Sequence, residues 1–197
     1  MVDKKNILVT GSDGQLGKSI KRISNQYDIY NFIFANKDQL DISDVSLVNK
    51  SINKKNIKIV INCAAYTNVE EAEYNKELAD LINHISVDNL ANICNQNNIQ
   101  LIHISTDFVF DGLKNSPYTE MDIPNPINYY GLTKLNGENK MMRYNLNKSI
   151  IIRSSWLYSN SNNNFVTKIL KKINNQLDIN VVDNEVGSPT NVNDLAQ

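Results

Sequence analysis

Three glycines follow directly on a short apolar segment near the start of this chain of 197 residues: Gly11, Gly14 and Gly17 come after residues 6–10. An apolar run of this kind is typical of a strand buried on both faces of a parallel sheet. One glycine permits a tight turn, another lets the backbone approach a pyrophosphate, and the third lets a helix pack closely on the strand. The phosphates then meet free N–H groups at the positive end of the helix. The stretch therefore predicts a strand, a turn and a helix arranged to bind a dinucleotide.

The rest of the chain alternates between strand-like and helix-like patterns. We expect strands at 30–35, 58–62, 100–104, 149–153 and 179–182. Helices are expected to begin at the good cap residues Ser43 and Asp44, to span about 75–97 and 165–173, and to begin again within 191–197. The alternation favours the α/β class, with a single doubly wound parallel sheet, that is, a Rossmann fold.

The predicted helix at about 75–97 carries an apolar stripe at helical spacing. Its members are Leu78, Leu81, Ile82, Ile85, Leu90 and Ile93. We interpret this stripe as part of the core and not as a cofactor contact.

Tyr130 and Lys134 are spaced so that a helix brings them onto one face, with Cβ atoms roughly 5–6 Å apart. A phenol has an unperturbed pKa of about 10. A neighbouring ammonium lowers the pKa of the phenol toward the range in which acid–base catalysis is efficient. A hydroxyl of Ser105 or Thr106, at the end of the strand before this helix, would hold the same oxygen while charge builds on it. These residues predict a site that moves a proton on or off an oxygen atom.

The same spacing occurs a second time, in Tyr144 and Lys148. This pair straddles the expected end of a helix and has no Ser-Thr pair on a strand before it. We interpret the second copy as a coincidence.

The residues after the second strand bear on which dinucleotide is bound. A carboxylate there would hold a ribose 2′-hydroxyl and favour NAD, whereas a basic group accepts a 2′-phosphate. The positions are occupied by Ala35, Asn36 and Lys37, which favours NADPH or tolerance of both forms. The alternative for Lys37 is a solvated surface charge.

Composition excludes several classes of partner and site. The net charge of −1 and the pI of about 6.1 do not suggest a nucleic-acid or membrane surface. The two cysteines, Cys63 and Cys94, are too far apart for a metal knuckle or redox pair, and His84 and His103 add no ligand cluster. We expect small buried thiols, no metal and, because the start of the chain lacks an apolar signal core, a cytoplasmic protein.

Two further segments are expected to border a ligand. The loop 108–128 is long, and long loops in compact domains are often functional. Trp156 follows a strand end, where its ring would either stack on a ligand ring or pack in the core.

Several motifs together are similar to those of the extended short-chain dehydrogenase/reductase family, and more narrowly of the dTDP-4-dehydrorhamnose reductases. They are Thr10-Gly11-x-x-Gly14-x-x-Gly17, Asp41-Ile42, Asn62-Cys63-Ala64-Ala65, Ser105-Thr106-Asp107-Phe108-Val109-Phe110-Asp111-Gly112, Tyr130-Gly131-Leu132-Thr133-Lys134, Ser155-Trp156 and Gly187-x-Pro189-Thr190. The resemblance covers essentially the whole chain. It implies NADPH- or NADH-dependent reduction of the C4 ketone of a nucleotide-linked sugar, dTDP-4-dehydro-L-rhamnose, in rhamnose biosynthesis.

The resemblance also implies roles for single residues. Tyr130 would give its proton to the C4 oxygen, Lys134 would lower the pKa of Tyr130 and bind the nicotinamide ribose, and Thr106 would hold the carbonyl oxygen. Asp107 and Trp156 fall at positions that look like sugar contacts. The implied cofactor contacts are Gly11, Gly14, Gln15, Leu16, Gly17, Asp41, Ile42, Ala64, Ala65, Tyr66, Tyr130 and Lys134. A homodimer is a further implication.

The chain departs from the family pattern in two ways. Cys63 replaces the alanine usual in the family's Asn-Ala-Ala-Ala motif, a small change that we expect to be tolerated. Family members also extend well beyond residue 197, so we expect a nucleotide-binding domain over 1–197 with the start of a truncated C-terminal substrate-binding part.

Two other functions stay open. One is a bifunctional 3,5-epimerase/4-reductase acting on a UDP-sugar, which needs an extra acid–base pair for which Cys63 is the one reactive-looking candidate. The other is a non-catalytic, NADP-binding regulatory subunit resembling the beta subunit of methionine adenosyltransferase.

Overall fold

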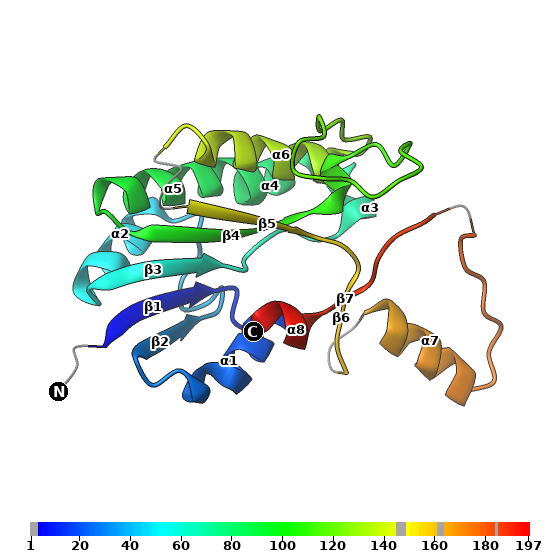
Figure 1. Ribbon diagram of the computed structural model, residues 1–197, viewed down its shortest axis with the longest axis horizontal. Coiled ribbons are helices and arrows are strands. Elements are labelled where there is room, and N and C mark those ends of the chain that lie inside the picture. Colours follow the sequence, from blue (N-terminus) through cyan, green and yellow to red (C-terminus); the bar gives the residue numbers. More distant parts are fainter. Residues whose placement is uncertain (1–3, 145–148, 161–163, 184) are drawn as a thin grey trace.

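The computed structural model describes residues 4–144, 149–160, 164–183 and 185–197. Five parallel strands form one sheet in the order β2-β1-β3-β4-β5 (Figure 1). Their bounds are β1 Lys5–Thr10, β2 Tyr30–Ala35, β3 Ile57–Asn62, β4 Gln100–Thr106 and β5 Ser149–Ser154. The order reverses between β1 and β3, which is where sheets of this class bind ligands.

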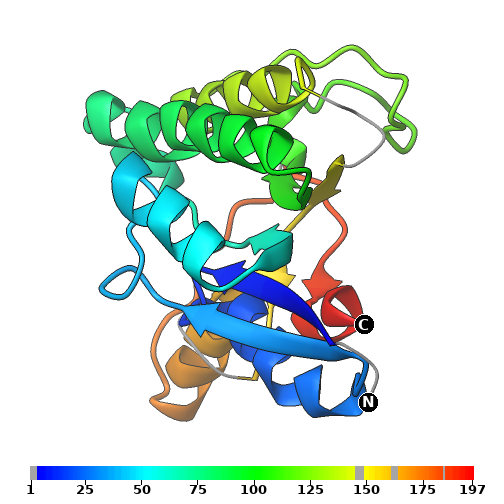
Figure 2. The same cartoon turned by 90° about the vertical axis from the view of Figure 1, so that its left-hand side faces the viewer.

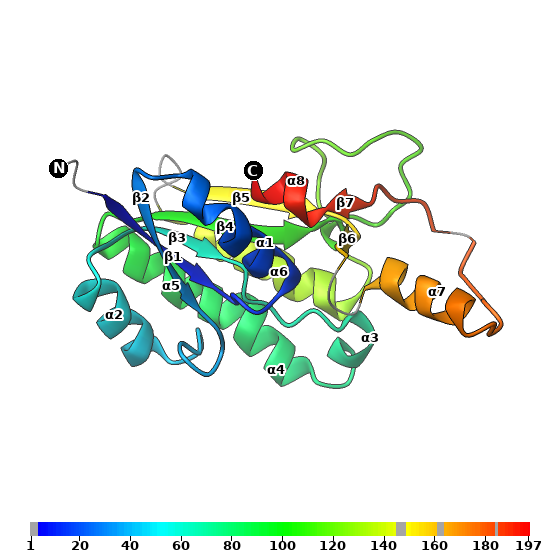
Figure 3. The ribbon, with the colours of Figure 1, turned by 90° about the horizontal axis from the view of Figure 1, so that it is seen from below.

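Helices cover both faces of this sheet, as Figures 2 and 3 show. They are α1 Gln15–Ile23, α2 Val45–Lys54, α3 Val69–Ala72, α4 Lys76–Asp80, α5 Ser86–Gln96, α6 Tyr129–Met141, α7 Phe165–Asn174 and α8 Val192–Ala196. A two-residue strand β6, Leu157–Tyr158, pairs with β7, Thr190–Asn191. Helix α7 and the segment after it extend to one side of the sheet (Figure 1). None of the helices within the described residues has the length and hydrophobicity to span a bilayer.

Side-chain alternation along the strands builds a core on each face. Leu8, Val60 and Leu101 face α2, α5 and α6 and pack on side chains such as Val48 and Leu90. The neighbouring residues on β1, Ile7 and Val9, face the other way, toward Leu16 and Ile20 of α1. Leu195 and Ala196 of α8 pack on that second core. The doubly wound parallel sheet expected from the sequence is confirmed.

Most predicted elements lie within two residues of the observed ones, but the strand predicted at 179–182 is wrong. In the described structure these residues pair with no other strand, and Val181 and Val182 are 56% and 66% exposed. A strand needs a hydrogen-bonded neighbour, and an apolar run of four residues does not supply one. The strand in this region is β7, which pairs with β6 beside the sheet.

The long helical region is interrupted by a π-helical segment, Leu81–Ile85, between α4 and α5. Leu90 and Ile93 are buried as expected, but Leu78, Leu81 and Ile85 are each more than a third exposed. The interpretation of the whole stripe as core is therefore wrong for these three residues.

Candidate active site

A cleft of about 800 Å³ lies at the carboxyl ends of the strands. The β1–α1 turn, the segments after β2, β3 and β4, the start of α6 and the segment after β5 all contribute to its wall. All the site residues proposed from the sequence line this cleft: Gly11, Gly14, Gln15, Leu16, Gly17, Asp41, Ile42, Ala64, Ala65, Tyr66, Thr106, Asp107, Tyr130, Lys134 and Trp156. The structure therefore brings the two sequence motifs, the glycine turn and the Tyr–Lys pair, into one site.

The glycine turn has the geometry that a phosphate cradle needs. Gly11 adopts a φ of +61°, and a Cβ at this position would lie 2.7 Å from the backbone nitrogen of Ala64. At Gly17 a Cβ would lie 2.6 Å from the Cα of Ser12, so the turn packs directly on the helix. No acidic side chain stands in the first turn of α1, and the positive end of this helix faces the cleft. These features fit a dinucleotide pyrophosphate.

The segment after β2 also borders the cleft through Asn36, Lys37 and Asp41. The Asn36 side chain donates to a carboxylate oxygen of Asp13 at 2.8 Å, which ties this segment to the glycine turn. Asp41 accepts from the hydroxyl and the backbone N–H of Ser43. These two hydrogen bonds lower the pKa of Asp41. Asp44, and not Ser43, caps α2 by accepting from the backbone of Leu47.

Tyr130 stands in the first turn of α6, which begins where Asn128 accepts a hydrogen bond from the Gly131 N–H at 2.7 Å. A Cβ at Gly131 would lie 2.1 Å from the carbonyl oxygen of Phe108, so only glycine lets the helix approach the end of β4 this closely. The approach brings the Tyr130 hydroxyl to Thr106. The Tyr130 and Phe108 rings meet edge to face, with centroids 5.9 Å apart.

The expected lowering of the Tyr130 pKa is not what the structure shows. Burial raises the pKa of Tyr130 to about 12, the Thr106 hydroxyl opposes this rise, and the charge of Asp107 adds to it. Burial likewise raises the pKa of Asp107. The Tyr130 hydroxyl is therefore protonated at neutral pH, as a proton donor must be.

Lys134 is 1% exposed, and its Nζ donates to the carbonyl oxygen of Ile104 at 2.7 Å. Burial lowers its pKa to about 8, against the opposing effects of Glu138 and Cys63. Burial raises the pKa of the Cys63 thiol to about 12, so this thiol is inert at neutral pH. The expectation of buried thiols is confirmed for Cys94, whereas Cys63 is only partly buried and lines the cleft.

A buried polar chain leads from the sheet to Lys134. The Thr10 hydroxyl donates to Asn62 Oδ1 at 2.6 Å, Asn62 Nδ2 lies 3.0 Å from His103 Nδ1, and His103 Nε2 lies 3.3 Å from Lys134 Nζ. His103 is wholly buried in β4. Sequence reasoning noted this histidine only as a non-ligand, although a polar residue within a buried strand signals a polar partner.

His103 should make the protein acid-sensitive. Burial and the charge of Lys134 hold the pKa of His103 well below its usual 6.5. Because the unfolded chain takes up this proton and the folded chain does not, the free energy of unfolding should fall below pH 6.5 by about 1.4 kcal/mol per pH unit. Urea unfolding at several pH values should show this slope in the parent protein and lose it in His103→Gln. Equal slopes in both proteins would contradict the prediction.

Asn83 is a site residue that sequence reasoning missed. It lies in the π-helical segment, is buried, and accepts from the Tyr66 N–H at 2.9 Å. Its Nδ2 donates to the carbonyl oxygen of Tyr66 and to Thr133 Oγ1. One side chain thus joins the cleft wall after β3 to α6. Nothing in the sequence signalled Asn83, because the expected apolar stripe ran through Leu81, Ile82 and Ile85 beside it.

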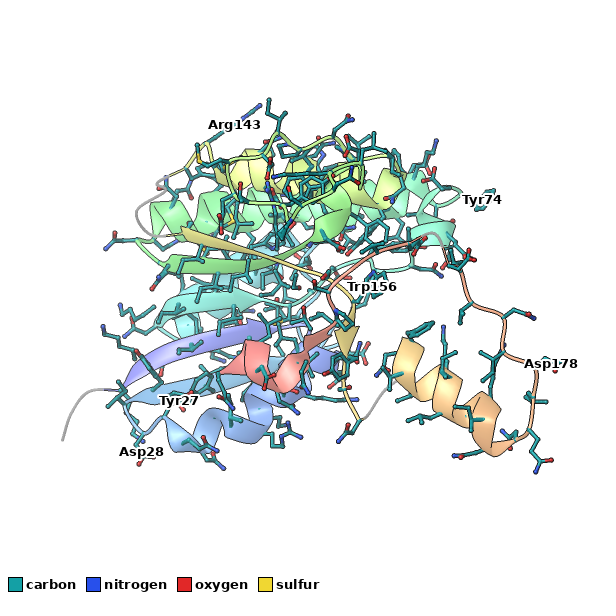
Figure 4. All side chains as sticks on the ribbon, turned by 45° about the vertical axis from the view of Figure 1, so that its right-hand side comes forward. Tyr27, Asp28, Tyr74, Arg143, Trp156 and Asp178 are labelled. Carbon is teal, nitrogen blue, oxygen red and sulfur yellow. The ribbon has the colours of Figure 1, made fainter. Side chains whose placement is uncertain are left out.

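Three other outcomes concern residues named from the sequence. Trp156 is 41% exposed, with a φ of +46°, and it lies beyond the sheet (Figure 4), so core packing is wrong for it. The Tyr144 hydroxyl donates to Asp88 at 2.8 Å, away from the cleft, and Lys148 lies outside the described residues. Leu78 and Ile82 line the cleft, which corrects the view that their helix takes no part in a site.

Two buried side-chain oxygens at the cleft lack a hydrogen-bond partner among the described residues, Tyr66 OH and Ser105 Oγ. Buried polar atoms are seldom left unpaired, so both oxygens suit a polar ligand in the cleft. The described residues hold no group of three or more His, Cys, Asp or Glu side chains placed to bind a metal ion.

Comparison with known proteins shows similarity to one family of sequences and to reductases of nucleotide-linked sugars. A sequence model described as "RmlD substrate binding domain" matches residues 5–197. A dTDP-4-dehydrorhamnose reductase of Aggregatibacter actinomycetemcomitans is 36% identical over 96% of this chain and 64% of its own length. A dTDP-4-keto-6-deoxy-D-glucose reductase of Streptomyces niveus is 35% identical over 96% of this chain and 66% of its own length.

Among solved structures, the crystal structure of a dTDP-4-dehydrorhamnose reductase from Bacillus anthracis in complex with NADP has a TM-score of 0.94. It is 38% identical and covers all of this chain, which in turn covers 69% of that protein. The chain therefore spans about two thirds of the length of the relatives that it matches.

Proposed function

Because this chain belongs to the RmlD substrate binding domain family, we propose that it carries the reducing centre of an NAD(P)H-dependent oxidoreductase. The proposed reaction is reduction of the C4 ketone of a nucleotide-linked 4-keto-6-deoxy sugar, dTDP-4-dehydro-L-rhamnose to dTDP-L-rhamnose. The observation that carries the proposal is the meeting of Tyr130, Thr106 and Lys134 with the glycine turn in one cleft. The NADP bound to the Bacillus anthracis relative supports NADPH, and NADH is the alternative cofactor.

The cofactor, when bound, supplies a hydride to the C4 carbon. Tyr130 then donates its phenolic proton to the C4 oxygen, which becomes the product hydroxyl. Thr106, whose side chain lies at the Tyr130 hydroxyl, turns its proton from Asp107 to that oxygen and stabilises it while its charge grows. In this proposal Gly11, Gly14, Gln15, Leu16 and Gly17 hold the pyrophosphate, Asp41 and Ile42 the adenine end, and Ala64, Ala65 and Tyr66 the middle of the cofactor.

Asp107 and Trp156 are proposed sugar contacts. The Asp107 carboxylate accepts from the Thr106 hydroxyl at 3.1 Å, so a sugar hydroxyl bound to Asp107 would lie beside the reacting oxygen. Trp156 presents an exposed ring to the cleft, which suits stacking on a sugar or base.

A second candidate substrate is the unepimerised sugar, dTDP-4-keto-6-deoxy-D-glucose, because the Streptomyces niveus relative carries that name. The bifunctional epimerase has less support, because the raised pKa of Cys63 makes its thiol unsuitable as an acid–base group at neutral pH. A regulatory subunit is disfavoured by the intact Tyr130, Thr106 and Lys134, although it would bind the same cofactor.

The test is NADPH oxidation by the complete gene product with dTDP- and UDP-linked 4-keto-6-deoxyglucose, with and without an added 3,5-epimerase. Oxidation that requires the epimerase supports the rhamnose reaction and identifies the nucleotide. If NADPH is oxidised without the added epimerase, the product is identified. A 6-deoxy-D-sugar would indicate the second candidate substrate, and a rhamnosyl product would indicate the bifunctional enzyme. No oxidation in any arm, with NADPH bound, would favour the regulatory subunit.

The proposal has three further parts. Residues 1–197 form the nucleotide-binding domain with the start of a substrate-binding part, a division that limited proteolysis of the complete gene product would test. The protein works in the cytoplasm, where reduced dinucleotides are available, and cell fractionation would test this. It forms a homodimer, which light scattering would test.

A further inference from the structure

Gly187 lies against the face of the Trp156 indole. A Cβ built on Gly187 would lie 2.7 Å from Trp156 Cε2, 2.8 Å from Cζ2 and 3.1 Å from Cδ2. Cδ2 and Cε2 are the two carbons that the rings of the indole share. Within the ring plane the edge atoms shield them, so a group comes this close to both only from above or below that plane. The glycine therefore covers one face of the ring at its fused bond.

This contact, and not the backbone conformation, is what requires a glycine at position 187. Gly11 and Gly112 have a positive φ, whereas Gly187 does not, so other residues could adopt its φ. An ordinary contact between carbon atoms is about 3.5–4.0 Å long. The methyl group of an alanine at this exposed position would therefore displace the Trp156 ring by about 1 Å and leave the rest of the fold in place.

The backbone of Trp156 is held by the same segment that supports its ring. Trp156 has a φ of +46°, which is unusual for a bulky residue. The Ser155 hydroxyl donates to the carbonyl oxygen of Ser188, and the Thr190 N–H donates to the carbonyl oxygen of Trp156 at 3.3 Å. Directly afterwards β6 pairs with β7 (Figure 1). A strained residue persists where its surroundings hold it, and such residues gather at ligand sites.

The side of the indole away from Gly187 is available to a ligand. Trp156 lines the cleft, and it is 41% exposed although Gly187 covers one face of the ring. The free side offers a flat apolar surface that suits stacking on a sugar or base ring. Because the ring rests on a residue that has no side chain, its position in the cleft depends on residue 187 being glycine.

We propose that Gly187 is a positioning residue: it supports the Trp156 indole and sets how far the ring reaches into the cleft to stack on the nucleotide sugar. The first and last residues of the Gly187-x-Pro189-Thr190 motif thus both act on Trp156, one through its ring and the other through its backbone. The support of the ring is a property of the chain itself. Its effect on the binding of a sugar nucleotide rests on the proposed function.

The first test is the position of the Gly187 Hα signals in NMR spectra of the complete gene product labelled with ¹³C,¹⁵N-glycine. The ring current of an aromatic ring shifts protons above its face upfield. We therefore expect an Hα signal upfield of the usual glycine range, and its loss in Gly187→Ala assigns it. The signal should return to the usual range in Trp156→Ala. A Gly187 signal within the usual range in the parent protein would overturn the proposal.

Ser188→Ala is the matched control. It changes an exposed side chain beside Gly187 and keeps the carbonyl oxygen that accepts from Ser155. The upfield Gly187 signal and the kinetic constants should both stay as in the parent protein. Loss of the upfield signal in this variant would mean that any change in the segment moves the ring, which would also overturn the proposal.

The second test is the Michaelis constant for the sugar nucleotide at saturating NADPH, in Gly187→Ala, in Trp156→Ala and in the double variant. Displacing the ring weakens its stacking, so KM should rise about 3- to 10-fold in Gly187→Ala, while kcat changes less than about twofold. In the Trp156→Ala background the same substitution should add no further rise, because no ring is left to displace. An unchanged KM in a folded Gly187→Ala protein, or equal rises in both backgrounds, would overturn the proposal.

The two tests separate a failure of this proposal from a failure of the proposed function. Absence of turnover in the parent protein would count against the reductase, and the Gly187 signal would still decide whether this glycine supports the ring. If Gly187→Ala does not fold, the spectra of the parent protein and of Trp156→Ala, assigned through the neighbouring residues, decide in its place.

Discussion

Replacing Tyr130 with phenylalanine is expected to lower the turnover number about 10²–10⁴-fold while leaving the dissociation constant for NADPH nearly unchanged. The substitution removes the proposed proton donor and little else. The ring stays against Phe108, edge to face at 5.9 Å, so packing at the start of α6 is preserved. Steady-state NADPH oxidation gives the turnover number, and fluorescence titration gives cofactor affinity.

The matched control is Tyr144→Phe, which removes the hydroxyl of the second Tyr-x-x-x-Lys copy. That hydroxyl donates to Asp88 at 2.8 Å and lies away from the cleft, so a normal turnover number is expected. A Tyr130→Phe protein with near-normal turnover would show that another group supplies the proton. Equal losses in both variants would point to damage to α6 and not to the removal of an acid.

The fold was predictable because its strongest signals are local. A buried strand followed by Gly11, Gly14 and Gly17 constrains the chain within a dozen residues, and the alternation of elements then favours one kind of sheet. The Tyr130–Lys134 spacing follows from the helical repeat alone. The predictions based on these local features were correct, because contacts with distant parts of the chain do not alter the glycine turn, the alternation of elements or the helical repeat.

The features that were missed depend on contacts between distant parts of the chain. The π-helical segment that turns Asn83 inward leaves no mark in apolar periodicity, and its partners Tyr66 and Thr133 are distant in sequence. The pKa of Tyr130 was expected to fall from spacing alone, but burial, which is a tertiary property, dominates it. Val181 and Val182 have strand propensity, but within the described part of the chain no strand lies beside them.

Replacing Gly11 with alanine is expected to destabilise the fold by about 2–4 kcal/mol. The new Cβ would lie 2.7–2.8 Å from backbone atoms of Cys63 and Ala64, none of which can rotate away. The residue also adopts a φ of +61°, which costs an alanine about 1–2 kcal/mol. The β1–α1 turn must move away from the end of β3 to relieve this contact. Because this turn is proposed to hold the pyrophosphate, the dissociation constant for NADPH should rise about tenfold or more. Urea unfolding and cofactor titration measure the two effects.

Gly112→Ala separates the close contact from the backbone strain. Gly112 also has a positive φ, +78°, but a Cβ there would meet nothing within 4 Å. The variant should therefore lose about 1 kcal/mol, since alanine also restricts the unfolded chain, and should bind NADPH normally. Equal destabilisation by the two substitutions would mean that φ alone explains the cost at Gly11. In that case the requirement for glycine at position 11 would come from its positive φ and not from the close approach of the β1–α1 turn to the end of β3. The glycine turn would then have room for a side chain at this position.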